Sequence, residues 1–276
     1  MEESLNNKEI QKNIENPIEK ELSLPEKVEK LEKENEELKN KLENMKKLFR
    51  ILGHDLITPI GNNAAFIDLL SESVKNDSMG EEELADNLDV ISRSSKSAHK
   101  LLEDLLRWSR LQQEGIKPEI SAVDLANQVE DSIAPLLLIA KEKGVNLKNE
   151  IPNDVDILAD SNMLRTVIRN LSSNAIKFTK RGGNVSISCE KKNNLVEIYI
   201  KDNGVGLAED QIKKLFESTG VSKDGTSGEK GTGFGLSISK EMIDIMNGTI
   251  HVESKGEGKG TTFTITLPEG KKEIAG

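Results

Sequence analysis

The 276-residue chain has a formal net charge of -10 and only 3% aromatic residues. These values argue against nucleic acid as a partner, because the chain offers little positive surface for phosphates and few rings for base stacking. No apolar run is long enough to cross a bilayer, and the charged N-terminus does not resemble a signal peptide. We therefore expect a cytoplasmic protein without a direct membrane span. The single cysteine, Cys189, excludes an internal disulfide and a multi-cysteine metal site.

The N-terminal region contains a heptad pattern. Residues 1–25 are polar and are predicted to be disordered or loosely ordered. From 26 to 52, apolar residues alternate at spacings of three and four, which predicts a coiled coil. Its predicted core positions are Val28, Asn35, Leu42 and Phe49, alternating with Leu31, Leu38, Met45 and Leu52. Asn35 at a core position favours a parallel, in-register homodimer over the alternative of an isolated, solvated helix.

Residues 53–115 are predicted to form a helical hairpin. The first helix is expected to continue to about Ser73 and the second to run from Glu81 to about Gln112, with a polar break at 75–80. Their apolar stripes are too narrow to bury much surface alone, so two copies of the hairpin are expected to pair as a four-helix bundle.

A histidine, a carboxylate and a hydroxyl lie close together at the start of this hairpin. Asp55 follows His54 directly, and Thr58 comes one helical turn later. Pro59 removes a backbone donor and is expected to bend the helix just after the histidine. A lone histidine on a helix is usually structural or merely exposed, and the other two histidines of the chain are interpreted in that way.

After Pro118 the pattern changes to alternating helices and strands. Helices are expected at 125–143, 161–178, 209–215 and 234–246, and strands at 145–147, 155–158, 184–190, 195–201, 249–254 and 261–267. The hairpins imply an antiparallel sheet covered on one side by helices. This domain is expected to span 116–270, followed by a tail at 271–276.

Polar residues share one face of the predicted helix 161–178. Asn170, Asn174 and Lys177 lie one turn apart along it. Amide oxygens in this arrangement can ligate a hard cation such as Mg2+, and a lysine one turn on can meet a phosphate. The alternative is an ordinary polar helix face.

Three glycine-rich runs follow. In 202–206, Asp202 at a strand end can accept a hydrogen bond from the exocyclic amine of a base, and the glycines let the backbone pass close to the ring. The run 231–236 opens a helix, where backbone amides form an anion site, although it matches neither a Walker loop nor a dinucleotide fingerprint. The run 256–260 lies between two strands and is interpreted as a hairpin turn.

The order and spacing of these motifs resemble those of the sensor histidine kinases of two-component systems. The corresponding family motifs are the H box at 54–59, the N box at 170–178, the G1 box at 202–206, the F box around Phe216, the G2 box at 231–236 and a final strand signal at 260–263. The resemblance covers about residues 45–268. It implies a dimeric α-helical bundle, made of the coiled coil and the hairpin, followed by an α/β sandwich ATP-binding domain with a mixed sheet. Chaperone ATPases and type II topoisomerases share that domain.

The resemblance also implies the cofactors ATP and Mg2+ and a set of site residues. The expected catalytic residues are His54, Asp55 and Thr58, and the expected metal ligand is Asn174. The expected nucleotide-binding residues are Asn170, Lys177, Phe178, Asp202, Gly204, Gly206, Gly231, Thr232, Gly233, Gly235, Leu236 and Thr262. A lid over residues 217–232 is expected to close over the phosphates.

The expected activity is autophosphorylation of His54, transfer to an aspartate in the receiver domain of a separate response regulator, and dephosphorylation of that regulator with help from Thr58. No sensor domain is recognisable before the coiled coil, so an unidentified upstream sensor is expected. One alternative is an ATP-binding pseudokinase or scaffold that signals by conformation alone, against which the intact His54, Asp55, Asn174 and Asp202 argue. The other is an ATPase of the chaperone or topoisomerase kind, which would not require a histidine, an acid and a proline in the stalk.

Overall fold

The computed structural model describes residues 23–51, 56–76, 79–111, 117–216, 224–229, 231 and 233–270. The predicted disorder of the N-terminal segment therefore lies outside the described residues except for 23–25, and the predicted tail at 271–276 lies outside them altogether. The chain divides into two units, Met1–Arg50 and Ile51–Gly276. In the described part of the chain, no helix combines the length and the apolarity that a bilayer crossing needs.

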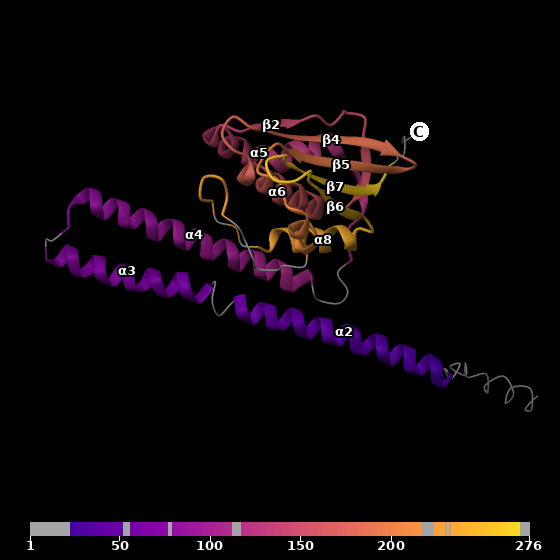
Figure 1. Cartoon of the computed structure of the whole chain (residues 1–276), viewed down its shortest axis with the longest axis horizontal. Coiled ribbons are helices and arrows are strands. Elements are labelled where there is room, and N and C mark those ends of the chain that lie inside the picture. Colours follow the sequence, from indigo (N-terminus) through magenta and orange to yellow (C-terminus); the bar gives the residue numbers. More distant parts are fainter. Residues whose placement is uncertain are drawn as a thin grey trace, which may run out of the picture. The chain divides into compact units, whose positions relative to one another are not determined.

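The first unit consists of helix α2 (Leu24–Ile51), shown in indigo in Figure 1. The helix begins two residues before the predicted coil because Glu26 accepts hydrogen bonds of 2.7 Å from both the backbone N–H and the hydroxyl of Ser23. The predicted core residues Val28, Leu31, Leu38 and Leu42 are exposed by 47–65% in the single chain. The parallel dimer stays a prediction, and these exposed residues are the ones that it would bury.

The second unit opens with a helical hairpin of α3 (Ile57–Lys75) and α4 (Glu81–Leu111). Both helices are confirmed with ends close to the predicted ones. The expected continuity of the first helix through residue 54 falls on residues 52–55, which lie outside the described residues. The two helices contact each other through a 3.0 Å hydrogen bond from the Asn63 amide to the Ser95 hydroxyl and through Leu70, which is 7% exposed.

The rest of the second unit is a mixed five-stranded sheet packed against helices (Figure 1). In spatial order its strands are β2 (Asn146–Asn149), β4 (Asn184–Lys192), β5 (Leu195–Asp202), β7 (Thr261–Pro268) and β6 (Thr249–Glu253). The mixed sheet that the resemblance implied is confirmed. The purely antiparallel sheet expected from the hairpins is wrong at one edge, where β2 and β4 run parallel. The chain between them contains a strand and a long helix, and a connection of that length can return the chain in the same direction.

A second, two-stranded sheet was not predicted. Strand β1 (Ser121–Asp124) pairs antiparallel with β3 (Asp156–Ala159). Strand β1 has four residues, of which only Val123 is buried. The sequence therefore shows no alternation of apolar and polar residues by which the strand could have been predicted.

Three helices cover one face of the five-stranded sheet. They are α5 (Leu125–Lys143), α6 (Ser161–Phe178) and α8 (Gly235–Ile245). Ile187, Ile198 and Ile265 point into this layer with 0% exposure, and the residues that alternate with them along the strands are partly exposed. Helix α6 is the central element because Leu164, Ile168 and Leu171 on its inner face are also 0% exposed. A short helix α7 (Glu209–Lys214) follows β5.

Candidate functional site

The carboxylate of Asp202 is the most constrained acidic group near the glycine-rich runs. Asp202 ends β5 and is 6% exposed, and its Oδ1 accepts hydrogen bonds from the backbone N–H groups of Gly204 (2.8 Å) and Thr261 (3.2 Å). Burial raises the pKa of Asp202 above its ordinary value, and the two backbone hydrogen bonds oppose that rise. Both bonds that it accepts within the described part of the chain go to Oδ1, so Oδ2 is left to accept from a ligand.

The glycines after Asp202 are needed for close backbone contacts. A Cβ on Gly204 would lie 2.8 Å from the carbonyl carbon of Phe178, at the end of α6. Gly206 has φ +68, and a Cβ there would collide with the carbonyl of Gly256 in the β6–β7 turn. The sequence analysis assigned these glycines to make room for a ring, and the structure gives them a second role in letting three backbone segments meet.

The β6–β7 turn contacts the loop at 202–206 and stabilises it. The run 256–260 is a hairpin turn, as predicted, because β6 and β7 pair antiparallel on either side of it. In addition, the Gly258 N–H donates to Val205 O at 2.7 Å, and the Ser254 hydroxyl accepts from Leu207 N–H (3.0 Å) and donates to Gly260 O (2.7 Å). Sequence reasoning missed Ser254 and this supporting role.

One predicted residue lies on the other side of the sheet. Thr261 is 9% exposed and pairs across the strands with Asp202, whereas Thr262 is partly exposed and pairs with Lys201 and Glu253. The group of β7 that reaches the carboxylate is the backbone N–H of Thr261, which lies 3.2 Å from Asp202 Oδ1. The register of β5 on β7 decides this point.

The polar face of α6 lies against the start of α8. The Asn170 amide lies 3.4 Å from Gly235 O and 3.5 Å from the Ser239 hydroxyl, at the limit of hydrogen bonding. Asn174, one turn later, is partly buried, and its side chain makes no hydrogen bond to another residue in the described part of the chain. Its amide oxygen is therefore available to a ligand.

Lys177 and Phe178 end α6. Lys177 is 9% exposed, and its Nζ lies 4.9 Å from the centroid of the Phe178 ring. Burial lowers the pKa of Lys177, and the nearby carboxylates of Asp224 and Glu229 partly offset this effect. These carboxylates compensate part of the cost of burying the ammonium. The role of Lys177 at a phosphate stays a prediction.

The donor set fits Mg2+ that is shared with phosphate oxygens. Among the described residues, no group of three or more histidine, cysteine or acidic side chains could hold a metal ion. The Asn174 amide oxygen is a hard donor, and Mg2+ commonly keeps several waters and takes other ligands from substrate phosphates. The site residues present therefore fit the ion without a dedicated protein cage.

The glycine-rich run before α8 is described except for Thr232, which lies outside the described residues. Gly231 precedes it, and Gly233 has φ +76, a conformation that favours glycine. Gly235 begins α8, where a Cβ would meet Asn170 atoms only at ordinary contact distances of 3.7 Å or more, and Leu236 is partly buried.

Of the three residues expected to act in phosphotransfer, the structure describes one. Thr58 lies in the first turn of α3 and is exposed. His54 and Asp55 lie outside the described residues, so their roles stay predictions.

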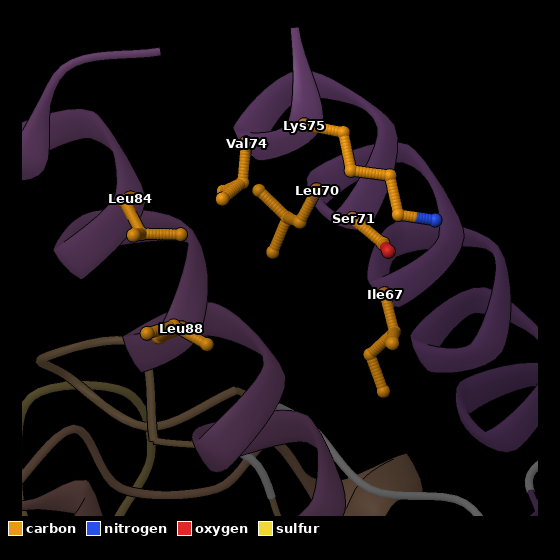
Figure 2. Close-up of a pocket in the computed structure, with 7 residues that line it drawn as sticks. All are labelled: Ile67, Leu70, Ser71, Val74, Lys75, Leu84 and Leu88. Carbon is orange, nitrogen blue, oxygen red and sulfur yellow. The ribbon is translucent and has the colours of Figure 1, made fainter. Parts of the chain in front are cut away.

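A hydrophobic pocket of about 390 Å³ lies between α3 and α4, far along the hairpin from Thr58. Figure 2 shows its lining residues, which are Ile67, Leu70, Ser71, Val74, Lys75, Leu84 and Leu88. Several of these are exposed large apolar side chains, including Ile67 (53%), Val74 (53%) and Leu88 (53%). This is an apolar face that the hairpin does not cover by itself.

Two protein families match the chain. Residues 44–114 match the "His Kinase A (phospho-acceptor) domain", and residues 159–271 match the "Histidine kinase-, DNA gyrase B-, and HSP90-like ATPase". The chain is 30% identical over 258 residues to the adaptive-response sensory-kinase SasA of Prochlorococcus marinus, an alignment that covers 92% of the chain and 67% of SasA. It therefore belongs to the sensor histidine kinases of two-component systems, and its second half is an ATP-binding domain of the histidine kinase type.

Other relatives are considerably longer than the chain. The sensor-like histidine kinase SenX3 of Mycolicibacterium smegmatis is 31% identical over 226 residues, which cover 79% of the chain and 56% of SenX3. The autoinducer 2 sensor kinase/phosphatase LuxQ of Vibrio parahaemolyticus is 31% identical over 235 residues, which cover 80% of the chain and 26% of LuxQ. The chain thus spans about half and about a quarter of these two proteins.

Solved structures share the fold. The histidine kinase ThkA, in a complex with the response regulator protein TrrA, has a TM-score of 0.68 at 19% identity, covering 92% of this chain and 69% of ThkA. The Acinetobacter baumannii histidine kinase AdeS has a TM-score of 0.62 at 19% identity, covering 79% of this chain and 98% of AdeS. At these identities the likeness concerns the fold alone.

Proposed function

We propose that this chain is an ATP-dependent protein histidine kinase that phosphorylates its own His54. It then passes the phosphoryl group to an aspartate of a separate response regulator and also dephosphorylates that regulator. The observation that carries the proposal is the buried Asp202 carboxylate, which is fixed through Oδ1 and offers Oδ2. It lies in a chain whose residues 44–114 match a phospho-acceptor domain. We place this activity in the cytoplasm, where ATP and response regulators are available.

The nucleotide is held by groups at two ends of the site. At the base end, Asp202 Oδ2 accepts from the exocyclic amine of adenine. At the phosphate end, Lys177 and the amides before α8 meet the phosphate oxygens. Asn174, with Asn170 in support, would hold Mg2+, and the ion would supply positive charge to the phosphate oxygens.

The hairpin supplies the nucleophile. The unprotonated ring nitrogen of His54 attacks the γ-phosphorus, the bond to the β–γ bridging oxygen breaks, and ADP leaves. Asp55 accepts a hydrogen bond from the other ring nitrogen, which fixes the tautomer and stabilises the positive charge that develops on the ring. Thr58, one turn along α3, orients a water when the phosphorylated regulator is dephosphorylated.

Labelling with γ-³²P-ATP tests the activity. The full chain with ATP and Mg2+ is expected to become labelled, and the label is expected to be lost in acid and retained in base, as for a phosphoramidate. Absence of label, with ATP binding intact, would show a pseudokinase. Label that resists acid would place the phosphate on a residue other than histidine.

We also propose that the chain works as a homodimer and that the apolar face around the α3–α4 pocket is part of the dimer interface. Leu88→Glu is expected to raise the dimer dissociation constant by about 100-fold or more, because a carboxylate would be buried without a partner. Sedimentation velocity measures the shift from dimer to monomer. Leu195→Glu is a matched control on β5, where the native leucine has a similar exposure of 42%. A Leu88→Glu variant that stays dimeric would remove this face from the interface.

A further inference from the structure

Residues 225–229 form a compact turn within the region expected to act as the lid. The turn is closed by hydrogen bonds from Gly225 N–H to Glu229 O (2.8 Å) and from Gly228 N–H to Gly225 O (3.0 Å). The Glu229 carboxylate also accepts from Ser227 N–H at 2.8 Å. The turn is therefore an organised element with its own internal contacts.

The turn is attached to the end of α6. The Thr226 N–H donates to Lys177 O at 3.0 Å, and the Thr226 hydroxyl lies 2.9 Å from Thr179 O. Gly225 lies so close to α6 that a Cβ there would be 2.6 Å from Lys177 Cγ. These contacts reach the backbone and the side-chain stem of Lys177, the residue assigned to the phosphates.

Lys143 joins the turn to α6. It is the last residue of α5, its side chain is 7% exposed, and its Nζ donates to Ile176 O (2.9 Å) and Lys177 O (2.6 Å). The same ammonium pairs with Glu229 Oε1 at 2.5 Å. Carbonyls at the end of a helix carry partial negative charge, so they compensate part of the cost of burying this cation, and Glu229 supplies the full opposite charge.

The charge state of Glu229 is consistent with this pairing. Burial tends to raise the pKa of Glu229, but hydrogen bonds from Lys143 and from backbone N–H groups outweigh it and lower the pKa below its ordinary value. The lowered pKa favours the ionised carboxylate of Glu229 in its contact with Lys143.

We propose that Lys143 is a positioning residue for ATP: it holds the 225–229 turn against the end of α6, so that Lys177 and this part of the lid are preset at the phosphates. Lys143 belongs to none of the sequence motifs and lies 34 residues before Lys177 in the chain. The inference rests on the proposed function in one respect, namely that Lys177 meets the phosphates of ATP. A site that is already ordered loses less conformational entropy when the ligand binds. Loss of the Lys143 contacts is therefore expected to weaken ATP binding.

Calorimetric titration of the full chain with ATP and with adenosine, both with Mg2+, separates this role from a structural one. Lys143→Met is expected to weaken ATP binding by about tenfold, and Glu229→Gln by about threefold. The dissociation constant of adenosine is expected to change by less than about twofold in both variants, because adenosine has no phosphates to reach the end of the site that Lys143 positions. Lys143→Arg is expected to retain most of the ATP affinity. Lys191→Met is the matched control, because it removes a partly exposed ion pair with Glu269 (3.1 Å) elsewhere.

A double variant tests whether Lys143 and Glu229 act as one unit. Lys143→Met with Glu229→Gln is expected to bind ATP about as weakly as Lys143→Met alone, because the second change removes a contact already lost. ATP affinity at the wild-type level in Lys143→Met, an equal loss for ATP and adenosine, or additive losses in the double variant would each overturn the proposal. If Lys143→Met does not fold, the variants Glu229→Gln and Gly225→Ala test the proposal instead. Both must then weaken the binding of ATP more than the binding of adenosine.

These titrations measure binding and not phosphotransfer. A wild-type chain that binds ATP but does not label His54 would overturn the proposed kinase activity and leave the role of Lys143 standing. If the wild-type chain becomes labelled but the Lys143 and Glu229 variants bind ATP normally, the proposed kinase activity stands and the role of Lys143 is overturned.

Discussion

The His54→Gln variant is expected to incorporate no phosphate from ATP above background while binding the nucleotide as the wild type does. Glutamine keeps a polar side chain of similar length, but its amide nitrogen is not a nucleophile. The residues assigned to ATP lie in the α/β part of the chain and not on the hairpin. Filter-bound label after incubation with γ-³²P-ATP, together with calorimetric titration, measures both properties.

His99→Gln is the matched control for this variant. His99 lies on α4, where it is exposed and 3.8 Å from Glu103, so its loss is expected to leave labelling unchanged. Label retained in His54→Gln would show that the phosphate is carried by another residue, and loss of label in both variants would point to damage to the hairpin.

Asp202→Asn is expected to weaken ATP binding by roughly 10- to 100-fold, because an amide donor would face the donor amine of adenine in a buried site. The new side chain can keep its oxygen at the Oδ1 position, where Gly204 and Thr261 donate. Its nitrogen then takes the Oδ2 position and suits the carbonyl of guanine, so the preference for ATP over GTP is expected to fall. Competition of both nucleotides for a fluorescent ATP analogue measures the change.

The stability of the same variant is not expected to fall with its affinity for ATP. Burial raises the pKa of Asp202, so the folded chain favours the protonated carboxyl, and its contribution to stability is lost as pH rises through the folded pKa. At neutral pH the wild type carries the cost of a buried ionised group and Asp202→Asn does not. We expect a nucleotide-free thermal midpoint at least equal to that of the wild type. Asp154→Asn, an exposed change, is the control. A lower midpoint with unchanged nucleotide preference would mean that Asp202 is a structural residue.

The long elements of the fold could be predicted because their patterns are local. Helices α5 and α6 begin and end at the predicted residues, since Asp124 and Asp160 cap them and Gly144 ends α5 in a left-handed conformation. Strand β1 was missed because it has only four residues with one buried side chain, and its partner β3 lies more than 30 residues further along the chain. The parallel pairing of β2 with β4 depends on how a long connection returns to the sheet, which no local pattern encodes.

The candidate site was predictable where one short segment carries the chemistry. Asp202 with its glycines and the asparagines of α6 are such segments. The contact of Thr261 with Asp202 was not predicted because it depends on the register of β5 on β7, and the role of Thr262 stays a prediction. Lys143 gave no signal at all, since a lysine at the end of a helix is ordinary until the fold brings Glu229 and the end of α6 to it.

The contact between Asp202 and Thr261 forms only in the completed sheet, so the proposed adenine acceptor depends on the completed sheet as well. The two residues are 59 positions apart, and the Thr261 N–H reaches the carboxylate only after β7 has docked on β5. A nascent or partly unfolded chain therefore contains every residue of the 202–206 loop and still lacks the acceptor in its working geometry. If Asp202 accepts from adenine as proposed, ATP is expected to bind the folded domain in preference to its partly folded precursors, and so to shift the folding equilibrium towards the native state.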